Sequence, residues 1–296
     1  MSDFAIQTQS LTKNYGSVHA LRGVDLEVRR GEIFGFLGPN GSGKTTTIRC
    51  LLDLTRPNAG TSRVLGLDPQ KQSRQVRARS GYLPGELRLE DGMTVEATLR
   101  YLNALRGGKS DWGYVRKLAE RLALDLKIQC RNLSKGNKQK VGVVQALMHK
   151  PELLLLDEPT SGLDPLIQQE VLHLIQEAKR EGTTVFFSSH IISEVEQVAE
   201  RVGIIRQGMV VEVAGTQELM KRALRRARVR FQKPQPDPGL EHLAGVKVLG
   251  TDGMTVHLQI EGEMDALIKE LAKFPVADFE TERPSLEEIF LAYYEK

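Results

Sequence analysis

The chain has few cysteines and no long apolar run, and these two features exclude several classes of protein. Its two cysteines, Cys50 and Cys130, stand far apart and outside any Cys-x-x-Cys pair. This argues against a disulfide framework or a structural metal site and indicates reduced thiols in a cytosolic protein. The first ten residues have neither the basic start nor the apolar core of a secretory signal. No uninterrupted apolar run reaches the roughly 18 residues that a spanning helix needs, so we do not expect the chain to cross a membrane by itself.

The composition also lacks a strong charge of either sign. With 296 residues, 40% of them hydrophobic and 27% charged, the chain is long enough for one large and one smaller domain with buried cores. Its formal net charge of +3 is close to balance, so bulk electrostatics do not favour nucleic acid as a partner. We therefore expect a globular protein with no nucleic-acid partner.

Short apolar runs that end in turn residues predict an α/β domain over residues 1–220. The continuous runs suit strands buried on both faces of a parallel sheet. The expected strands are 5–10, 21–29, 33–37, 153–156 and 184–187. From about residue 86 the apolar residues follow helical spacing, which predicts a helical subdomain at about 86–150 between two sheet-forming regions.

Beyond residue 220 the pattern changes to a small α+β module over residues 221–296. A basic stretch and a Pro/Asp/Gly-rich linker precede an expected hairpin, helix and strand, at 221–233, 234–239, 246–260, 264–273 and 276–281. Ser285 and Glu288 form a capping box that predicts a closing helix at 285–294. We interpret the basic stretch as a solvated helix leading into an edge strand, and its alternative is a surface for anionic lipid headgroups.

A phosphate-binding loop follows the apolar run at 33–37. Residues 38–45 read Gly-Pro-Asn-Gly-Ser-Gly-Lys-Thr and fit the pattern G-x4-G-K-[ST] between a strand and a helix. Glycines let successive backbone N–H groups converge on a phosphate, and the helix that begins at the lysine adds the positive end of its dipole. Lys44 would bridge the terminal phosphates and the Thr45 hydroxyl would hold Mg²⁺. The predicted nucleotide-binding residues here are Gly38, Pro39, Asn40, Gly41, Ser42, Gly43, Lys44, Thr45 and Thr46.

A second site is predicted where the apolar run at 153–156 ends in Asp157 and Glu158. The carboxyl ends of parallel strands form the crevice in which such sheets bind ligands. Asp157 would bind Mg²⁺, through water, and Glu158 would polarise the attacking water. The alternative is that Asp-Glu-Pro only begins a loop and caps the next helix. The phosphate loop in the same chain favours the catalytic interpretation, because ATP hydrolysis needs both a metal-binding acid and a base.

Over about residues 5–215 the sequence resembles the ATP-binding cassette (ABC) ATPases. Residues 133–137, Leu-Ser-Lys-Gly-Asn, resemble the family's LSGGQ signature and are followed by an apolar helix and the Asp157–Glu158 strand. Residues 161–164, Ser-Gly-Leu-Asp, resemble its D-loop, and His190 resembles its switch histidine. Tyr15 stands where such proteins stack the adenine on an aromatic ring. Six motifs in one order are far more specific than any single motif.

The resemblance implies a fold, cofactors and partners. The fold would be α/β, with a mostly parallel core sheet of the P-loop NTPase type, an antiparallel β subdomain and a helical subdomain. ATP and Mg²⁺ would be the cofactors, and Glu158 and His190 the catalytic residues. Two cassettes would pair head to tail, so that residues of one reach the γ-phosphate held by the other. The residues that the resemblance adds to the nucleotide site are Tyr15, Ser134, Lys135, Gly136 and Asp164. For Ser134 a plain helix N-cap is the alternative.

Two positions depart from the family pattern. Gly85 stands where the family usually has a glutamine that touches Mg²⁺ and senses the membrane partner, and Glu86 follows it. Either Glu86 serves as a metal ligand or the metal has only water on that side. Lys135 is a milder departure that adds positive charge to the signature. Residues 137–140, Asn-Lys-Gln-Lys, look like the guanine-reading NKxD motif of GTPases, but Lys140 replaces its acid, which disfavours GTP.

The spacing of the motifs separates the family's possible roles. Chromosome-type relatives place hundreds of coiled-coil residues between the phosphate loop and the signature, whereas Lys44 and Ser134 are 90 positions apart here. Translation-factor relatives usually carry two sets of motifs in one chain. The remaining interpretation is a transporter subunit at the cytoplasmic face of the membrane, whose separate transmembrane permease docks on residues 84–126. Residues 81–84, the signature and the tail at 284–290 resemble bacterial exporter cassettes, including drug and antibiotic-resistance types. The alternative is a soluble ABC ATPase that acts on the ribosome or another machine.

Overall fold

The structure is a computed structural model that describes residues 3–222, 225–233, 239–282 and 290, and it divides into two compact units, 1–214 and 215–296. The division expected after residue 220 falls inside helix α8 (Thr216–Arg222). The expected closing helix at 285–294 lies outside the described residues except for position 290, as does the expected linker except for position 239. Each unit is described by itself.

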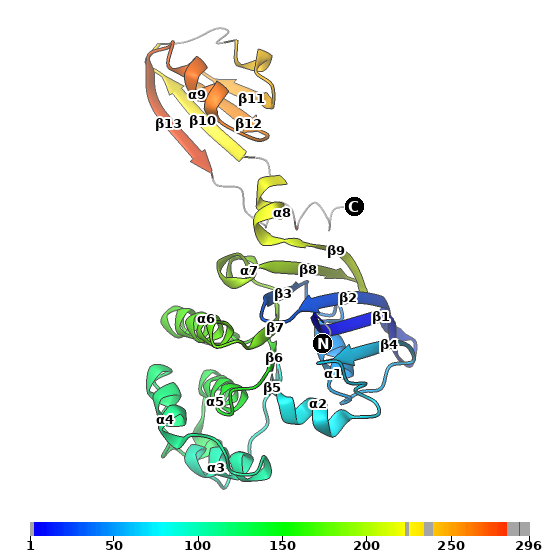
Figure 1. Ribbon diagram of the computed structural model, residues 1–296. Coiled ribbons are helices and arrows are strands. Elements are labelled where there is room, and N and C mark those ends of the chain that lie inside the picture. Colours follow the sequence, from blue (N-terminus) through cyan, green and yellow to red (C-terminus); the bar gives the residue numbers. More distant parts are fainter. Residues whose placement is uncertain (1–2, 223–224, 234–238, 283–289, 291–296) are drawn as a thin grey trace. The chain divides into compact units, whose positions relative to one another are not determined.

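The first unit is built on a six-stranded sheet with the order β5-β6-β7-β3-β8-β9 (Figure 1). β3 pairs in parallel with β7 and β8, and β6 pairs in parallel with β5 and β7. Every residue of β3, β6 and β7 is buried, as expected for strands covered on both faces. The predicted mostly parallel core is confirmed. The strands are β3 (Ile33–Leu37), β5 (Ser80–Leu83), β6 (Leu153–Asp157), β7 (Thr184–Ser189), β8 (Arg201–Arg206) and β9 (Met209–Gly215).

A three-stranded antiparallel sheet with the order β2-β1-β4 forms the expected antiparallel subdomain. Its central strand pairs on both sides, as Gln7 lies opposite Glu27 in one neighbour and Arg63 in the other. Its inward residues share one apolar core with β3, β7 and helix α1, including Ile6, Phe34 and other fully buried side chains. The bounds are β1 (Phe4–Tyr15), β2 (Val18–Arg29), β4 (Ala59–Val64) and α1 (Lys44–Leu51).

Three helices, α3 (Val95–Leu105), α4 (Trp112–Arg121) and α5 (Lys135–Leu147), lie within the expected helical subdomain. Polar caps start the first two: the Thr94 hydroxyl accepts from Ala97 N at 3.2 Å, and the Asp111 carboxylate accepts from Gly113 N at 2.8 Å. Helices α2, α6 and α7 flank the sheet, at Ser73–Arg79, Pro165–Arg180 and Ile192–Val198. Among the described residues, none of the helices combines the length and the apolar character that a membrane crossing requires.

The second unit contains a four-stranded sheet with the order β11-β12-β10-β13, whose neighbouring strands all pair antiparallel. One face packs on helix α9 (Asp265–Leu271), which contributes Leu267 and Leu271 to a separate apolar core. This unit matches the expected α+β composition. Its strands are β10 (Arg225–Phe231), β11 (Val246–Asp252), β12 (Thr255–Ile260) and β13 (Val276–Glu282).

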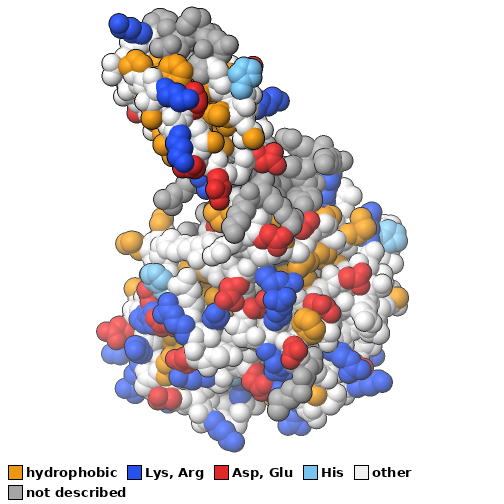
Figure 2. Space-filling model, turned by 45° about the horizontal axis from the view of Figure 1, so that its top comes forward, with side chains coloured by type: hydrophobic (Ala, Val, Ile, Leu, Met, Phe, Trp, Pro, Cys, Tyr) orange, Lys and Arg blue, Asp and Glu red, His pale blue; other side chains and the backbone are white. Residues whose placement is uncertain are grey.

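Residues 225–231 of the basic stretch form β10, which is an internal strand of this sheet. β10 lies between β12 and β13, so the expectation of an edge strand is wrong. Ala227, Val229 and Phe231 point into the core while the arginines between them are exposed. The reason is the period of two: alternate positions of a strand face opposite sides of a sheet. Arg228 pairs with Glu280 at 2.6 Å on the exposed face, and Figure 2 shows acidic and basic side chains mixed over the visible surface of both units.

Candidate active site

The phosphate-loop sequence connects β3 to α1 and depends on glycine at three points. Gly41 and Gly43 have φ angles of +80° and +114°, in the left-handed region that favours glycine. Gly38 has no room for a side chain, because a Cβ there would lie 2.5 Å from the Ile205 carbonyl oxygen. The loop thus takes a course that other residues would not permit, and it ends where the N-terminus of α1 begins at Lys44.

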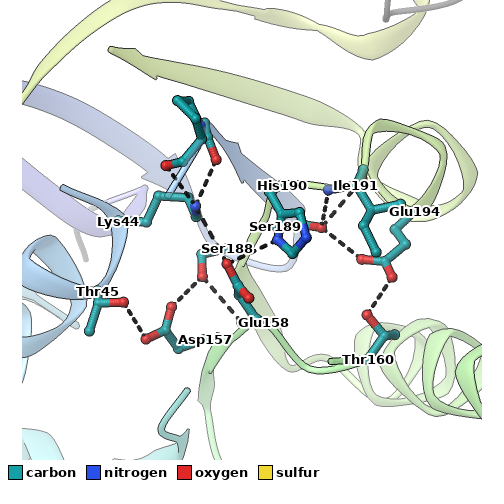
Figure 3. Close-up of polar contacts among 12 residues, drawn as sticks. Lys44, Thr45, Asp157, Glu158, Thr160, Ser188, Ser189, His190, Ile191 and Glu194 are labelled. Atoms are coloured by element: carbon teal, nitrogen blue, oxygen red, sulfur yellow. Dashed lines mark hydrogen bonds and ion pairs between the residues drawn. The ribbon is translucent and has the colours of Figure 1, made fainter. Parts of the chain in front are cut away.

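Lys44 points back across this loop toward the strand ends. Its side chain is 4% exposed, and Nζ donates to the carbonyl oxygens of Gly38 at 2.6 Å and Pro39 at 3.2 Å (Figure 3). The same Nζ lies 3.6 Å from Glu158 Oε1. Burial lowers the pKa of Lys44, and the nearby carboxylates of Glu158 and Asp157 oppose that shift. A buried cation therefore lies between the loop and the carboxylates.

Asp157 ends β6 and is held by a hydroxyl on each side. It is 1% exposed; Thr45 Oγ1 donates to its Oδ2 at 2.6 Å, and Ser188 Oγ donates to its Oδ1 at 2.5 Å (Figure 3). Hydroxyl and carboxylate oxygens are the hard ligands that Mg²⁺ prefers. The structure thus brings together the two residues that the sequence assigns to the metal.

Glu158, the next residue, has an unusual backbone conformation, and its side chain lies between Lys44 and His190. Its φ is +51°, which is uncommon for a residue with a Cβ. Its Oε1 lies 3.1 Å from Nδ1 of His190, at the end of β7, as well as near Lys44. Its carbonyl oxygen accepts a hydrogen bond from Gln139 Nε2 at 2.8 Å. The predicted catalytic pair, Glu158 and His190, is in direct contact.

The residues present fit a nucleotide phosphate and a magnesium ion. Ser42 Oγ, inside the loop, is buried and has no hydrogen-bond partner among the described residues, so it is able to donate to a bound phosphate. Lys44 supplies a buried charge, and Thr45 with Asp157 supplies a pair of oxygen ligands. Thr46 follows in α1 and is half-buried.

The signature and D-loop residues lie against one another within the chain. A Cβ on Gly136 would lie 2.6 Å from the Gly162 carbonyl oxygen, and the Lys135 methylenes lie 3.6–3.8 Å from the position of a Cβ on Gly162. Ser134 caps α5, accepting from Asn137 N at 3.2 Å, and Asp164 caps α6 in the same way. Within the described part of the chain, no hydrogen bond joins Ser134, Lys135, Gly136 or Asp164 to the phosphate loop.

Three further residues predicted from sequence are Tyr15, Gly85 and Glu86. Tyr15 ends β1, is 45% exposed, and has Lys13 Nζ 5.1 Å from its ring centroid. A Cβ on Gly85 would lie 3.0 Å from Asp157 Oδ2, so position 85 adjoins the carboxylate, whereas Glu86 is exposed. The place of the usual glutamine is therefore next to Asp157 and carries no side chain here.

Three buried polar residues support the cluster and were not singled out from sequence: Gln139, Ser188 and Glu194. Glu194 is 6% exposed and accepts from Ser189 Oγ at 2.7 Å and from the Thr160 hydroxyl (Figure 3). It thereby joins the loop after Glu158 to the loop that holds His190. Ser188 carried a signal, because it directly follows the apolar run at 184–187, whereas Gln139 lies between Lys138 and Lys140 and carried none.

Comparison with known proteins finds family models and relatives that match the chain. Residues 21–161 match the family model described as ABC transporter, and residues 215–294 match the model of the C-terminal domain of DrrA1-3-like ATP-binding proteins. The bacitracin transport ATP-binding protein BcrA of Enterococcus faecalis is 37% identical over 223 residues, covering 74% of this chain and 72% of that protein. The daunorubicin/doxorubicin resistance ATP-binding protein DrrA of Streptomyces peucetius is 31% identical over 310 residues, covering 97% and 92%.

Solved structures give the same result. An ATP-binding subunit of an ABC transporter has a TM-score of 0.66 and 29% identity, covering 73% of this chain and 92% of that one. A dimeric bacterial ABC transporter cassette, at 24% identity, shares the fold with a TM-score of 0.65, covering 71% and 98%. The curated relatives, which are more than 30% identical and are covered over more than two thirds of their length, show that the chain belongs to the ATP-binding cassette transporter ATPases.

Proposed function

We propose that this chain is the ATP-hydrolysing subunit of an ABC exporter, working as one of two paired cassettes on a separate transmembrane permease at the cytoplasmic face of the membrane. The observation that supports hydrolysis best is the cluster of Lys44, Glu158 and His190, with Nζ and Nδ1 at 3.6 Å and 3.1 Å from one carboxylate oxygen. Export is supported by the drug-resistance and bacitracin-transport names of relatives that match most of the chain.

The proposed chemistry assigns each residue a task. The backbone of the phosphate loop and Lys44 bind the terminal phosphates, and Tyr15 stacks on the adenine. Thr45 and Asp157 hold Mg²⁺, which when bound neutralises charge on the phosphate oxygens. Glu158 accepts a hydrogen bond from the attacking water and polarises it. His190 holds the Glu158 carboxylate in place and contacts the γ-phosphate.

Pairing completes this site in the proposal. Ser134, Lys135, Gly136 and Asp164 make no hydrogen bond to the phosphate loop of their own chain in the described structure. Ser134 and the N-terminus of α5 form a set of hydroxyl and backbone donors that suits an anion. We assign these residues to the γ-phosphate held by a second cassette, which is either another copy of this chain or a different one.

The first test is the Glu158→Gln variant. It keeps the shape of the side chain but loses the base, so ATP binding should persist while hydrolysis slows by about 10²-fold or more. With ATP, this variant should elute as a dimer on a sizing column. Hydrolysis near the wild-type rate would remove Glu158 from the proposed role.

The second test addresses the partner. Tagged protein is recovered from detergent-solubilised membranes of the native host and the bound proteins are identified. A multi-spanning protein is the expected partner. Recovery of ribosomal or other soluble proteins alone would overturn the transporter role and leave an ABC ATPase that acts on another machine.

A further inference from the structure

Gln139 is a buried amide that reaches from the signature helix to the backbone of Glu158. It lies three residues beyond Gly136 in α5, so the two positions share one face of the helix. Its side chain is 5% exposed, and Nε2 donates to the carbonyl oxygen of Glu158 at 2.8 Å. The helix that begins with the signature therefore contacts the main chain of the candidate base in the same molecule.

The backbone that Gln139 contacts is in a conformation that needs support. A residue with a Cβ in the left-handed region is strained, and such residues persist where their surroundings hold them. Glu158, at φ +51°, is held on one side by its own N–H, which donates to the Ser188 carbonyl at 3.1 Å. On the other side its carbonyl accepts from Gln139 Nε2 at 2.8 Å and from Ser161 N at 3.1 Å. These bonds fix the peptide groups before and after its Cα, and Gln139 is the donor that comes from the signature helix.

These two peptide groups set the direction in which the Glu158 carboxylate points. The side chain leaves the Cα toward Lys44 and His190, and a rotation about φ or ψ would move Oε1 away from both groups. Because a displacement of about 1 Å costs a catalytic group up to 10²-fold in rate, a bond that fixes this Cα acts on catalysis without touching the substrate.

We propose that Gln139 is a positioning residue for Glu158, which makes the orientation of the base depend on the placement of the signature helix in the same chain. This inference rests on the proposed function. In a pair of cassettes, the first turn of α5 contacts the nucleotide held by the partner. A shift of that helix would move Gln139, and with it the backbone and carboxylate of Glu158, which acts on the chain's own nucleotide.

The main experiment compares Gln139→Leu with the matched control Gln145→Leu. Gln145 lies on the same helix, six residues further along, and is half-buried. We expect Gln139→Leu to bind ATP with wild-type affinity, to lower kcat by about 10-fold to 10²-fold, and to reduce the Hill coefficient for ATP. The control should match the wild type in all three. Equal kcat and equal Hill coefficients for both variants would overturn the inference.

A second variant separates positioning from simple packing. Gln139→Glu keeps the shape, but an ionised carboxylate only accepts hydrogen bonds, whereas a protonated one has an O–H to donate. Its kcat relative to wild type should therefore fall as the pH rises from about 6 to about 8.5, since a buried carboxyl titrates above its usual pKa. A ratio that stays constant over that range refutes the hydrogen-bond role.

The outcome is distinguishable from failure of the proposed function. If the wild-type chain itself bound no ATP or hydrolysed none, the function would be wrong and the Gln139 variants would have nothing to change. If the wild type hydrolyses ATP and Gln139→Leu does so equally well, the function stands and only the positioning role is wrong.

Discussion

The hydrogen bond between Thr45 and Asp157 gives a prediction with two separable readouts. Asp157 is 1% exposed, and its Oδ2 accepts from Thr45 Oγ1 at 2.6 Å. Thr45→Val replaces the donor by a methyl group of similar size and leaves a buried carboxylate oxygen without this partner. Such a loss costs about 1–3 kcal/mol, and more where the group is charged. Ser188 still donates to the other oxygen at 2.5 Å, so we take about 2 kcal/mol for the nucleotide-free chain.

That free energy should lower the melting temperature of the first unit by about 4–8 °C, at the 2–4 °C per kcal/mol typical of units of about 200 residues. The assay is thermal unfolding in magnesium-free buffer. In a second measurement, the gain in ATP affinity on adding Mg²⁺ should be smaller for the variant, because the metal loses a proposed oxygen ligand.

Thr45→Ser is the matched control, since it keeps the hydroxyl and removes only a methyl group. It should retain both the melting temperature and the magnesium effect to within a small margin. The reasoning is refuted if Thr45→Val melts with the wild type, or if Thr45→Ser is destabilised by the same amount, because the hydroxyl would then not be the group that matters.

Three further predictions follow from single contacts. Lys44→Ala should weaken ATP binding in a titration, because a bound phosphate loses its buried cation; unchanged affinity would contradict the phosphate-loop assignment. Gly136→Ala should lower the free energy of unfolding by about 1–3 kcal/mol, because the new Cβ lies 2.6 Å from a carbonyl oxygen; denaturant titration that gives wild-type stability would contradict that close contact. Burial lowers the pKa of His149 to about 4, and the positive charge of Arg106 contributes to this shift as the smaller cause. The unfolded chain therefore binds more protons between pH 6.5 and 4, and stability should fall on acidification through that range, by about 1 kcal/mol at pH 5 after allowance for partial exposure. The His149→Gln variant should lose this part of the pH dependence, and an unchanged slope would contradict it.

The sequence was sufficient for the parts of the site that are local in the chain. Gly38 to Gly43 form one loop, and Lys44 and Thr45 begin the helix that follows it, so their spacing alone predicts their arrangement. Asp157 and Glu158 follow an apolar strand, and the edge of a parallel sheet is where such residues gather. The roles of these residues in catalysis stay predictions.

The partners of these residues were not predictable in the same way. Gln139 is 19 positions from Glu158, and Ser188 is 31 positions from Asp157. Which polar residue meets which depends on the strand order β6-β7-β3, and no local pattern records that order. The same limit explains β10: its arginines predict an exposed surface correctly, but only pairing on both sides shows that the strand is internal.

The contact of Gly136 with Gly162 affects the entropic cost of bringing two cassettes together. The signature and the D-loop are already packed together in the single chain, with the Lys135 methylenes over Gly162 and Asp164 capping the next helix. Association is weakened by every loop that must be ordered at an interface. A preassembled surface of this kind avoids that entropic cost, so in the proposed pair the affinity between chains would be governed by the bound nucleotide rather than by folding at the interface.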